Sequence, residues 1–208
     1  NIKWERGSLS KKDSITVEVQ LQDAAGNIVY QDKINDFKTV LGNYKTNVQF
    51  NTTIPKVKTW SAETPYLYSL YLTLKNAKGE ILEVVPQKLG FKKVEIKGTD
   101  FLVNGKRVFL KGVNRHEVHP RNGHTLSKDD MRKDMEMMKK LNINAVRNSH
   151  YPPDPYWIEL CDEYGLYVVD EANIESHGLG YDLTVTLGNK PQWKEAHLQR
   201  IQRMYERD

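Results

Sequence analysis

Three polar clusters contain the residues of this chain that are best suited to chemistry. Each follows a short apolar stretch, and they span residues 114–119 (NRHEVH), 147–150 (RNSH) and 170–177 (DEANIESH). His116, His150 and His177 lie in different clusters, and this equivalence favours one shared site over three unrelated loop residues. We interpret the other histidines as loop or surface residues: His119, His124 and His197.

Two kinds of chemistry fit these clusters. Glu175 and His177 are two residues apart, so in an extended backbone both point the same way and could give an oxygen and a nitrogen to a divalent cation. Carboxylates such as Glu117, Glu171 and Glu175 could instead form a glycosidase pair, which needs a separation of about 5–5.5 Å for retention or roughly 6.5–9.5 Å for inversion of configuration. Residues 116–119 (HEVH) do not fit the zinc-protease motif, which has two residues between its glutamate and second histidine.

Strands that alternate with helices are predicted to position the clusters. Asn104-Gly105, between apolar residues 101–103 and 108–110, predicts a hairpin with a type I′ turn, and strands and helices alternate after it. The first helix is expected to begin at Ser127, with Asp130 as its capping partner. Its buried stripe is predicted to consist of Met131, Met135, Met138 and Leu141.

The later elements repeat this pattern. A strand is predicted over 143–147, a helix from Asp154-Pro155 to Gly165, and a buried parallel strand over 166–169 (LYVV). The last helix is expected from about Pro191 onward, with four inward side chains: Trp193, Leu198, Ile201 and Met204. A TIM barrel has eight β/α units, so these three predict the start of an incomplete (β/α)8 barrel whose site lies at the C-terminal strand ends.

The preceding part of the chain has a period of two. Apolar and polar residues alternate over 15–21 and 68–74, and turn residues occur at 25–27 and 76–79. Short, regularly spaced strands are typical of a sandwich. We therefore predict an immunoglobulin-like β-sandwich over residues 1–97 and the N-terminal part of a TIM-barrel catalytic domain, truncated, over 98–208.

The composition narrows the class of protein. The chain has 208 residues, 38% of them hydrophobic, and its 31 basic and 27 acidic residues leave a net charge of +4 without a basic block. This pattern indicates neither a nucleic acid nor a membrane as partner, and residues 1–10 lack the apolar core of a signal peptide. Cys161 is the single cysteine, which excludes an intrachain disulfide and a cysteine metal cluster, so we expect it in the core.

Residues 144–152 (NAVRNSHYP), with Trp157-Ile158, Asp162 and 165–169 (GLYVV) after them, resemble the first signature of glycoside hydrolase family 2. Residues 60–68, 112–117 and 170–178 are also similar to the β-galactosidases of that family. The resemblance is strong over 55–208 and holds only by pattern over 1–54.

The resemblance implies retaining hydrolysis by two glutamates, both expected beyond Asp208, so the isolated chain is expected to be inactive. By the same resemblance His116 and His150 would contact sugar hydroxyls and stabilise the oxocarbenium-like transition state, and Arg147 would orient the nucleophile. Glu175 and His177 match positions that bind Mg²⁺ beside the acid/base.

We therefore expect a fragment of a bacterial β-galactosidase that hydrolyses terminal β-D-galactosyl residues of oligosaccharides or glycosides. The full-length parent is expected to be a homo-oligomer, in the cytoplasm or the periplasm. β-Glucuronidases and β-mannosidases share the scaffold, but residues 116–120 (HEVHP) look like the β-galactosidase form. A non-catalytic carbohydrate-binding or scaffold module, and strand-end clusters that are only structural ion-pair networks, are the alternatives.

Overall fold

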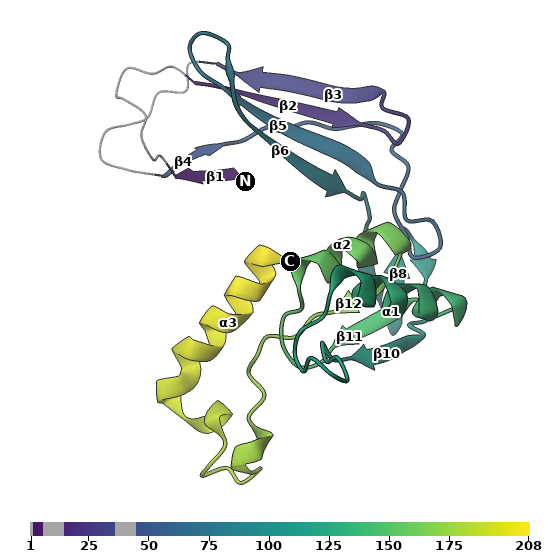
Figure 1. Cartoon of the computed structure of the whole chain (residues 1–208), viewed down its shortest axis with the longest axis vertical. Helices are drawn as coiled ribbons and strands as arrows, with labels where there is room; N and C mark the ends of the chain where they lie inside the picture. Colours follow the sequence, from purple (N-terminus) through teal and green to yellow (C-terminus); the bar gives the residue numbers. More distant parts are fainter. Residues whose placement is uncertain (1, 6–14, 36–44) are drawn as a thin grey trace. The chain divides into compact units, whose positions relative to one another are not determined.

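The chain divides into two compact units. The computed structural model describes residues 2–5, 15–35 and 45–208 (Figure 1). By contacts, one unit comprises Asn1–Trp60 and Tyr66–Lys92, and the other comprises Ser61–Pro65 and Lys93–Asp208. The domain limits 1–97 and 98–208 remain a prediction from the sequence.

The first unit is a β-sheet region. A four-stranded antiparallel sheet has the order β3-β2-β5-β6 and is formed by β2 (Thr16–Gln22), β3 (Ile28–Ile34), β5 (Tyr68–Lys75) and β6 (Ile81–Leu89) (Figure 1). A second antiparallel pair joins β1 (Ile2–Glu5) to β4 (Lys45–Val48). The alternation predicted for 15–21 buries Ile15, Val19 and Leu21, because successive strand side chains point to opposite faces.

The second unit opens with a hairpin. It consists of β7 (Val94–Lys97), β8 (Asp100–Val103) and β9 (Lys106–Arg107), all antiparallel. Asn104 and Gly105 have φ of 52° and 76°, and a type I′ turn requires such positive values at both central residues. The predicted hairpin is therefore confirmed, although its second arm starts earlier than predicted: β9 is Lys106–Arg107, and the Val108 N–H donates to Phe101 O at 2.9 Å.

Three parallel strands follow, each leading into helical structure. They are β10 (Gly112–Arg115), β11 (Ala145–Asn148) and β12 (Tyr167–Val169), in the order β10-β11-β12. The helices are α1 (Lys128–Lys140), α2 (Pro155–Tyr164) and α3 (Lys194–Arg207), and the short 3-10 turns are η1 (His177–Leu179), η2 (Leu187–Asn189) and η3 (Pro191–Trp193). Arg147 pairs in register with Asn114 on one side and Val169 on the other, so the three C-terminal strand ends share one edge.

Local sequence sets the helix limits. Ser127 and Asp130 form the predicted capping box at the start of α1. Asp154 caps α2 ahead of Pro155, and Gly165 ends it in the left-handed conformation with φ of 80°. A Cβ on Gly165 would press against the carbonyl group of Ala62, so both the backbone angle and the close packing require glycine here.

One hydrophobic core joins α1, α2 and the parallel sheet. Its fully buried members are Met131, Met135, Met138, Val146, Trp157, Leu160, Cys161 and Leu166. Burial raises the pKa of the Cys161 thiol, as expected for an inert core residue. Among the described helices, none is both long and apolar enough to cross a bilayer.

Some predicted core positions are wrong. Leu141 is 67% exposed because α1 ends at Lys140, where the stripe no longer faces α2 and the sheet. Trp193, Leu198 and Ile201 are also exposed, so α3 is amphipathic without burying its apolar side chains among the described residues. The predicted fold class is confirmed: a β-sandwich region is followed by three β/α units of an incomplete barrel.

Candidate active site

The parallel strand ends bring three of the predicted site residues together. His116 directly follows β10, Arg147 lies in β11, and His150 follows β11 by two residues. The rings of His116 and His150 meet edge to face, with centroids 5.2 Å apart and planes at 82°. Two imidazoles from different strands thus flank one point at the C-terminal edge, where TIM-barrel sites are built.

Glu171, which follows β12, binds two of these residues. One carboxylate oxygen, Oε1, forms an ion pair with Nε of Arg147, and the other, Oε2, lies 2.8 Å from Nδ1 of His150. Nη2 of Arg147 is 3.3 Å from the same His150 nitrogen. The side chains are 40% exposed for Arg147, 29% for His150 and 22% for Glu171, so the group lies in a partly desolvated position open to one side.

Glu171 is held as an anion. Desolvation raises the pKa of Glu171, but the hydrogen bonds from His150 and Arg147 outweigh it, so this pKa lies below its ordinary value. The Glu171 backbone N–H donates to Oδ1 of Asp170, at 3.1 Å, which fixes the start of the loop. The strand end therefore presents an ionised carboxylate with both oxygens engaged.

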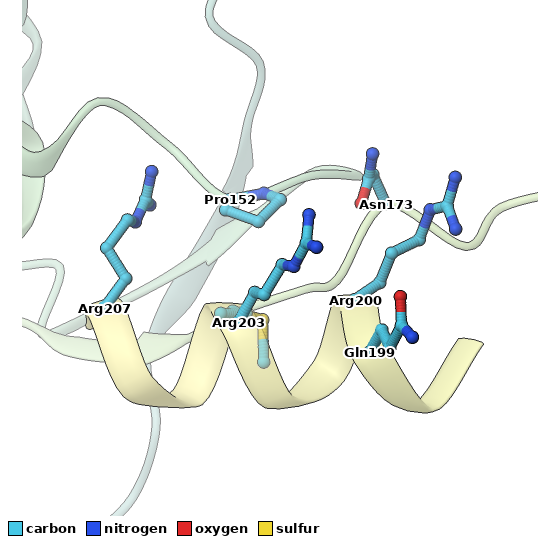
Figure 2. A pocket seen from close by; sticks show the side chains of 7 residues that line it. Pro152, Asn173, Gln199, Arg200, Arg203 and Arg207 are labelled. Carbon is cyan, nitrogen blue, oxygen red and sulfur yellow. The ribbon is translucent and has the colours of Figure 1, made fainter. Parts of the chain in front are cut away.

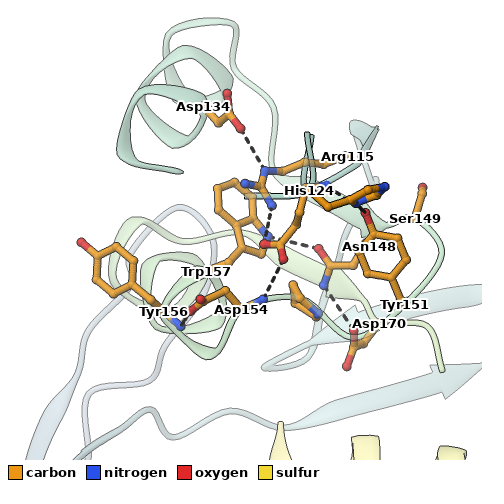
Figure 3. Close-up of polar contacts among 12 residues, drawn as sticks. Arg115, His124, Asp134, Asn148, Ser149, Tyr151, Asp154, Tyr156, Trp157 and Asp170 are labelled. Carbon is orange, nitrogen blue, oxygen red and sulfur yellow. Dashed lines mark hydrogen bonds and ion pairs between the residues drawn. The ribbon is translucent and has the colours of Figure 1, made fainter. Parts of the chain in front are cut away.

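A buried arginine supports the first strand end (Figure 3). The side chain of Arg115 is 4% exposed; its Nε donates to Asp134 at 3.0 Å, and its Nη1 donates to Glu117 at 3.2 Å. Its guanidinium lies over the ring of Trp157, 3.7 Å from the centroid. Glu117 also accepts from the Asp154 backbone N–H at 3.1 Å, so His116 sits between two residues anchored to α1 and α2.

A second chain of hydrogen bonds supports the other two strand ends. Trp157 Nε1 donates to Asn148 Oδ1 at 3.1 Å, and Asn148 Nδ2 donates to Asp170 Oδ1 at 3.3 Å (Figure 3). Burial, and secondarily the nearby Asp208 carboxylate, raise the pKa of the Asp170 carboxyl. Asn148 is 3% exposed, so this link is shielded from water and rigidly joins β11 to β12.

Glu175 and His177 form a separate pair. Glu175 Oε1 lies 2.8 Å from His177 Nδ1, and the two side chains are about half exposed. Mg²⁺ usually keeps several waters and is bound through one or two carboxylates, so Glu175 fits such an open site, whereas the imidazole of His177 is a less usual ligand for this ion. Within the described ranges, no cluster of three or more His, Cys, Asp or Glu side chains is placed to hold an ion, so these two residues would supply only part of a coordination shell.

A basic hollow lies beside α3 (Figure 2). It is lined by Pro152, Asn173, Gln199, Arg200, Arg203, Met204 and Arg207. Arg207 Nη2 donates to the carbonyl oxygen of Pro153 at 2.7 Å, which ties the end of α3 to the loop after β11. The predicted site residues do not line this hollow, so we assign the candidate site to the strand ends.

Comparison with known proteins identifies the family. The model for the TIM barrel domain of glycosyl hydrolases family 2 matches residues 94–208, and a second model, for glycosyl hydrolases family 2, matches residues 4–92. The chain belongs to glycosyl hydrolases family 2. The predicted family resemblance is thereby confirmed.

Several curated relatives in family 2 are named beta-galactosidase. The relative from Priestia megaterium is 46% identical over 93% of this chain and 19% of its own length, and that from Pectobacterium atrosepticum is 41% identical over 98% of this chain and 20% of its own length. The chain thus spans about a fifth of the length of these relatives. Among solved structures, a β-glucuronidase from Ruminococcus gnavus in complex with D-glucaro 1,5-lactone has a TM-score of 0.74 and 25% identity, covering 99% of this chain and 34% of that one.

The sequence predicted residues that the structure brings together, His116, Arg147 and His150, but not their partners. The three carboxylates considered for a glycosidase pair each bind a different basic group: Glu117 binds Arg115, Glu171 binds Arg147 and His150, and Glu175 binds His177. Arg115, Asp134 and Trp157 were missed as a supporting network. The available signal was the charge of Arg115 at the C-terminal end of a short strand, because a charge that becomes buried there needs partners.

Proposed function

We propose that the protein containing this chain is a retaining β-galactosidase, with this chain supplying part of the sugar site. The observation that carries the proposal is the identity to relatives named beta-galactosidase, 41% and 46% for the two described above, together with the convergence of His116, Arg147 and His150. The likeness to β-glucuronidase structures is weaker in sequence, at 24–33% identity. Because of this likeness, a β-glucuronide is the alternative substrate to compare with a β-galactoside.

The proposed reaction is a double displacement. One glutamate attacks the anomeric carbon, and a second protonates the leaving oxygen and then activates water. We place both glutamates outside this chain, so that the chain alone does not hydrolyse the substrate. The carboxylates described at the strand ends already bind basic side chains, and this favours a role in positioning those side chains over a role as nucleophile or acid/base.

In this proposal the residues of this chain bind the sugar and stabilise the transition state. His116 and His150 hydrogen-bond sugar hydroxyls, and these contacts strengthen as positive charge develops on the ring. Arg147 extends its guanidinium beside them, and its remaining N–H groups orient the nucleophilic carboxylate and keep it ionised. Glu175 and His177 would hold Mg²⁺, which when bound would bias the ionisation of a neighbouring acid/base carboxyl.

The test is hydrolysis by the full-length protein and by the 208-residue chain, side by side. We expect the full-length protein to cleave a chromogenic β-galactoside with retention of the anomeric configuration, and the 208-residue chain to be inactive. A β-glucuronide and a β-mannoside serve as matched substrates. A preference for either of these would contradict the β-galactosidase proposal, and activity in the isolated chain would place a catalytic carboxylate within it.

The metal is tested separately in the full-length protein. We expect a chelator to lower kcat and added Mg²⁺ to restore it, and Glu175→Gln to weaken the Mg²⁺ concentration dependence. Glu195→Gln, an exposed position on α3, is the matched control. An unchanged Mg²⁺ dependence in Glu175→Gln would contradict the proposed ligand.

A further inference from the structure

We propose that Glu171 is a positioning residue of the sugar site. Its carboxylate keeps a proton on Nδ1 of His150, so that Nε2 is the hydrogen-bond acceptor whenever the ring is neutral, and it fixes the Arg147 guanidinium through Nε. The inference rests on the proposed function and deepens it, because it states which hydrogen-bonding role His150 offers a sugar hydroxyl.

The contact distances decide the tautomer. His150 Nδ1 is 2.8 Å from Glu171 Oε2 but 3.3 Å from Arg147 Nη2. An ionised carboxylate only accepts hydrogen bonds and a guanidinium only donates them. A proton on Nδ1 satisfies the shorter contact, whereas a lone pair there would face the carboxylate oxygen. The shorter, charge-assisted contact prevails, so Nδ1 carries the proton.

The consequence lies on the other side of the ring. A neutral imidazole has one N–H and one lone pair, so with the proton on Nδ1 the neutral form of His150 accepts a hydrogen bond at Nε2. A sugar hydroxyl would therefore donate to His150. This differs from a histidine with the proton on Nε2, which would donate to the hydroxyl oxygen.

Glu171 also limits the freedom of Arg147. The ion pair with Glu171 engages Nε, and Nη1 lies 3.5 Å from Asn114 Oδ1. The guanidinium is therefore held by a residue of β10 on one side and by a residue that follows β12 on the other. Arg147 and His150 are thus positioned by one carboxylate. Loss of Glu171 would disturb two groups of the site without removing either.

The carboxylate is poorly arranged to react itself. Both oxygens are engaged, one by Arg147 and one by His150, and the side chain is 22% exposed. The backbone N–H of Glu171 is held by Asp170. These contacts suit an orienting group better than a nucleophile that must form a bond to carbon.

The experiment uses the full-length protein, with Glu171→Gln and Glu171→Ala as the variants and Glu159→Gln, on the exposed face of α2, as the control. Carboxylates that orient metal-binding histidines are typically worth about 10- to 100-fold in affinity or activity, and we take the same range for a histidine that binds a sugar. We expect kcat on a chromogenic β-galactoside to fall by about this factor in Glu171→Gln and further in Glu171→Ala, with a smaller change in KM. Thermal unfolding of the variants reports whether they remain folded.

Two further readouts separate positioning from a merely structural role. If Glu171 acts through its partners, Glu171→Ala should cost several-fold less when His150 is already alanine, because the two losses are coupled. Formate should partly restore kcat in Glu171→Ala by returning a carboxylate, and azide should yield no glycosyl azide.

The outcomes distinguish this inference from the proposed function. A wild-type protein without β-galactosidase activity would overturn both. An active wild type with unchanged kcat in both variants, or with fully additive losses in the double variant, would overturn the role of Glu171 alone. Accumulation of a glycosyl azide in Glu171→Ala would show that Glu171 reacts directly and would also overturn it.

Discussion

Replacement of Arg115 by alanine should destabilise the second unit strongly. Its side chain is 4% exposed, binds Asp134 and Glu117, and stacks on Trp157. The change would leave two carboxylates without their cation and remove the guanidinium from the face of the indole. The strand end that carries His116 would lose its link to α1.

The magnitude follows from the burial of the partners. Removing one member of a buried ion pair costs about 3–5 kcal/mol. Asp134 is 45% exposed and can be rehydrated, whereas Glu117 is 19% exposed, so we expect the lower end, about 3 kcal/mol. Arg115→Met keeps an apolar contact with Trp157 while removing the charge, and should cost roughly 2 kcal/mol because a partly buried carboxylate stays unpaired.

The assay is urea unfolding of the 208-residue chain followed by far-ultraviolet circular dichroism. The described helices all lie in the second unit, so the helical signal reports on that unit. With a slope of about 2 kcal/mol per molar urea, the midpoint should fall by roughly 1.5 M in Arg115→Ala.

Arg132→Ala is the matched control for this prediction. Its ion pair with Asp129 lies on the surface of α1, with side chains 50% and 79% exposed, and such pairs are worth less than about 1 kcal/mol. Equal midpoint shifts for the two arginine variants would refute the reasoning that burial makes the Arg115 network important.

Three other predictions follow from packing and ionisation. Gly165→Ala should destabilise the second unit by more than the roughly 1–3 kcal/mol that a strained backbone costs, because the added Cβ also meets Ala62. Gly98 has a φ of 61° and open space where a Cβ would lie, so Gly98→Ala measures the cost of the backbone strain alone in the same urea assay. Cys161, 1% exposed with its pKa raised by burial, should resist a thiol reagent until urea unfolds the chain; rapid labelling of native protein would contradict its core position. Asp170→Asn should stabilise the second unit at neutral pH, and this gain in stability should vanish as the pH falls below the ordinary Asp pKa. The pKa of Asp170 is raised in the native state, so the native state binds more protons than the unfolded state and the wild type loses stability as the pH rises. A difference in stability that does not depend on pH would contradict this account.

Local features of the second unit could be predicted because they depend on neighbouring residues. The capping box at Ser127 and the Asp154-Pro155 start of α2 use contacts within one helical turn. The convergence of His116 and His150 also follows from sequence, since parallel strands place their C-terminal ends at one edge.

Contacts between distant residues could not be predicted in the same way. Glu171 binds Arg147 and His150 across more than twenty positions, and the sequence did not show which basic group each acidic residue would choose. The exposure of Leu198 also depends on what packs against α3, which helical periodicity alone does not determine. The sequence pattern therefore predicted candidate site residues, whereas the partners that orient them could be identified only in the structure.

The most direct test of the central claim is the kcat/KM of the full-length protein on a chromogenic β-galactoside after His150→Ala. Loss of a hydrogen-bonding group that acts in the transition state should lower it by about 10²- to 10³-fold. His197→Ala, on α3 beside Trp193, should leave it unchanged. An undiminished kcat/KM in His150→Ala would contradict the account, because the strand-end cluster would then be a structural network and not a sugar site.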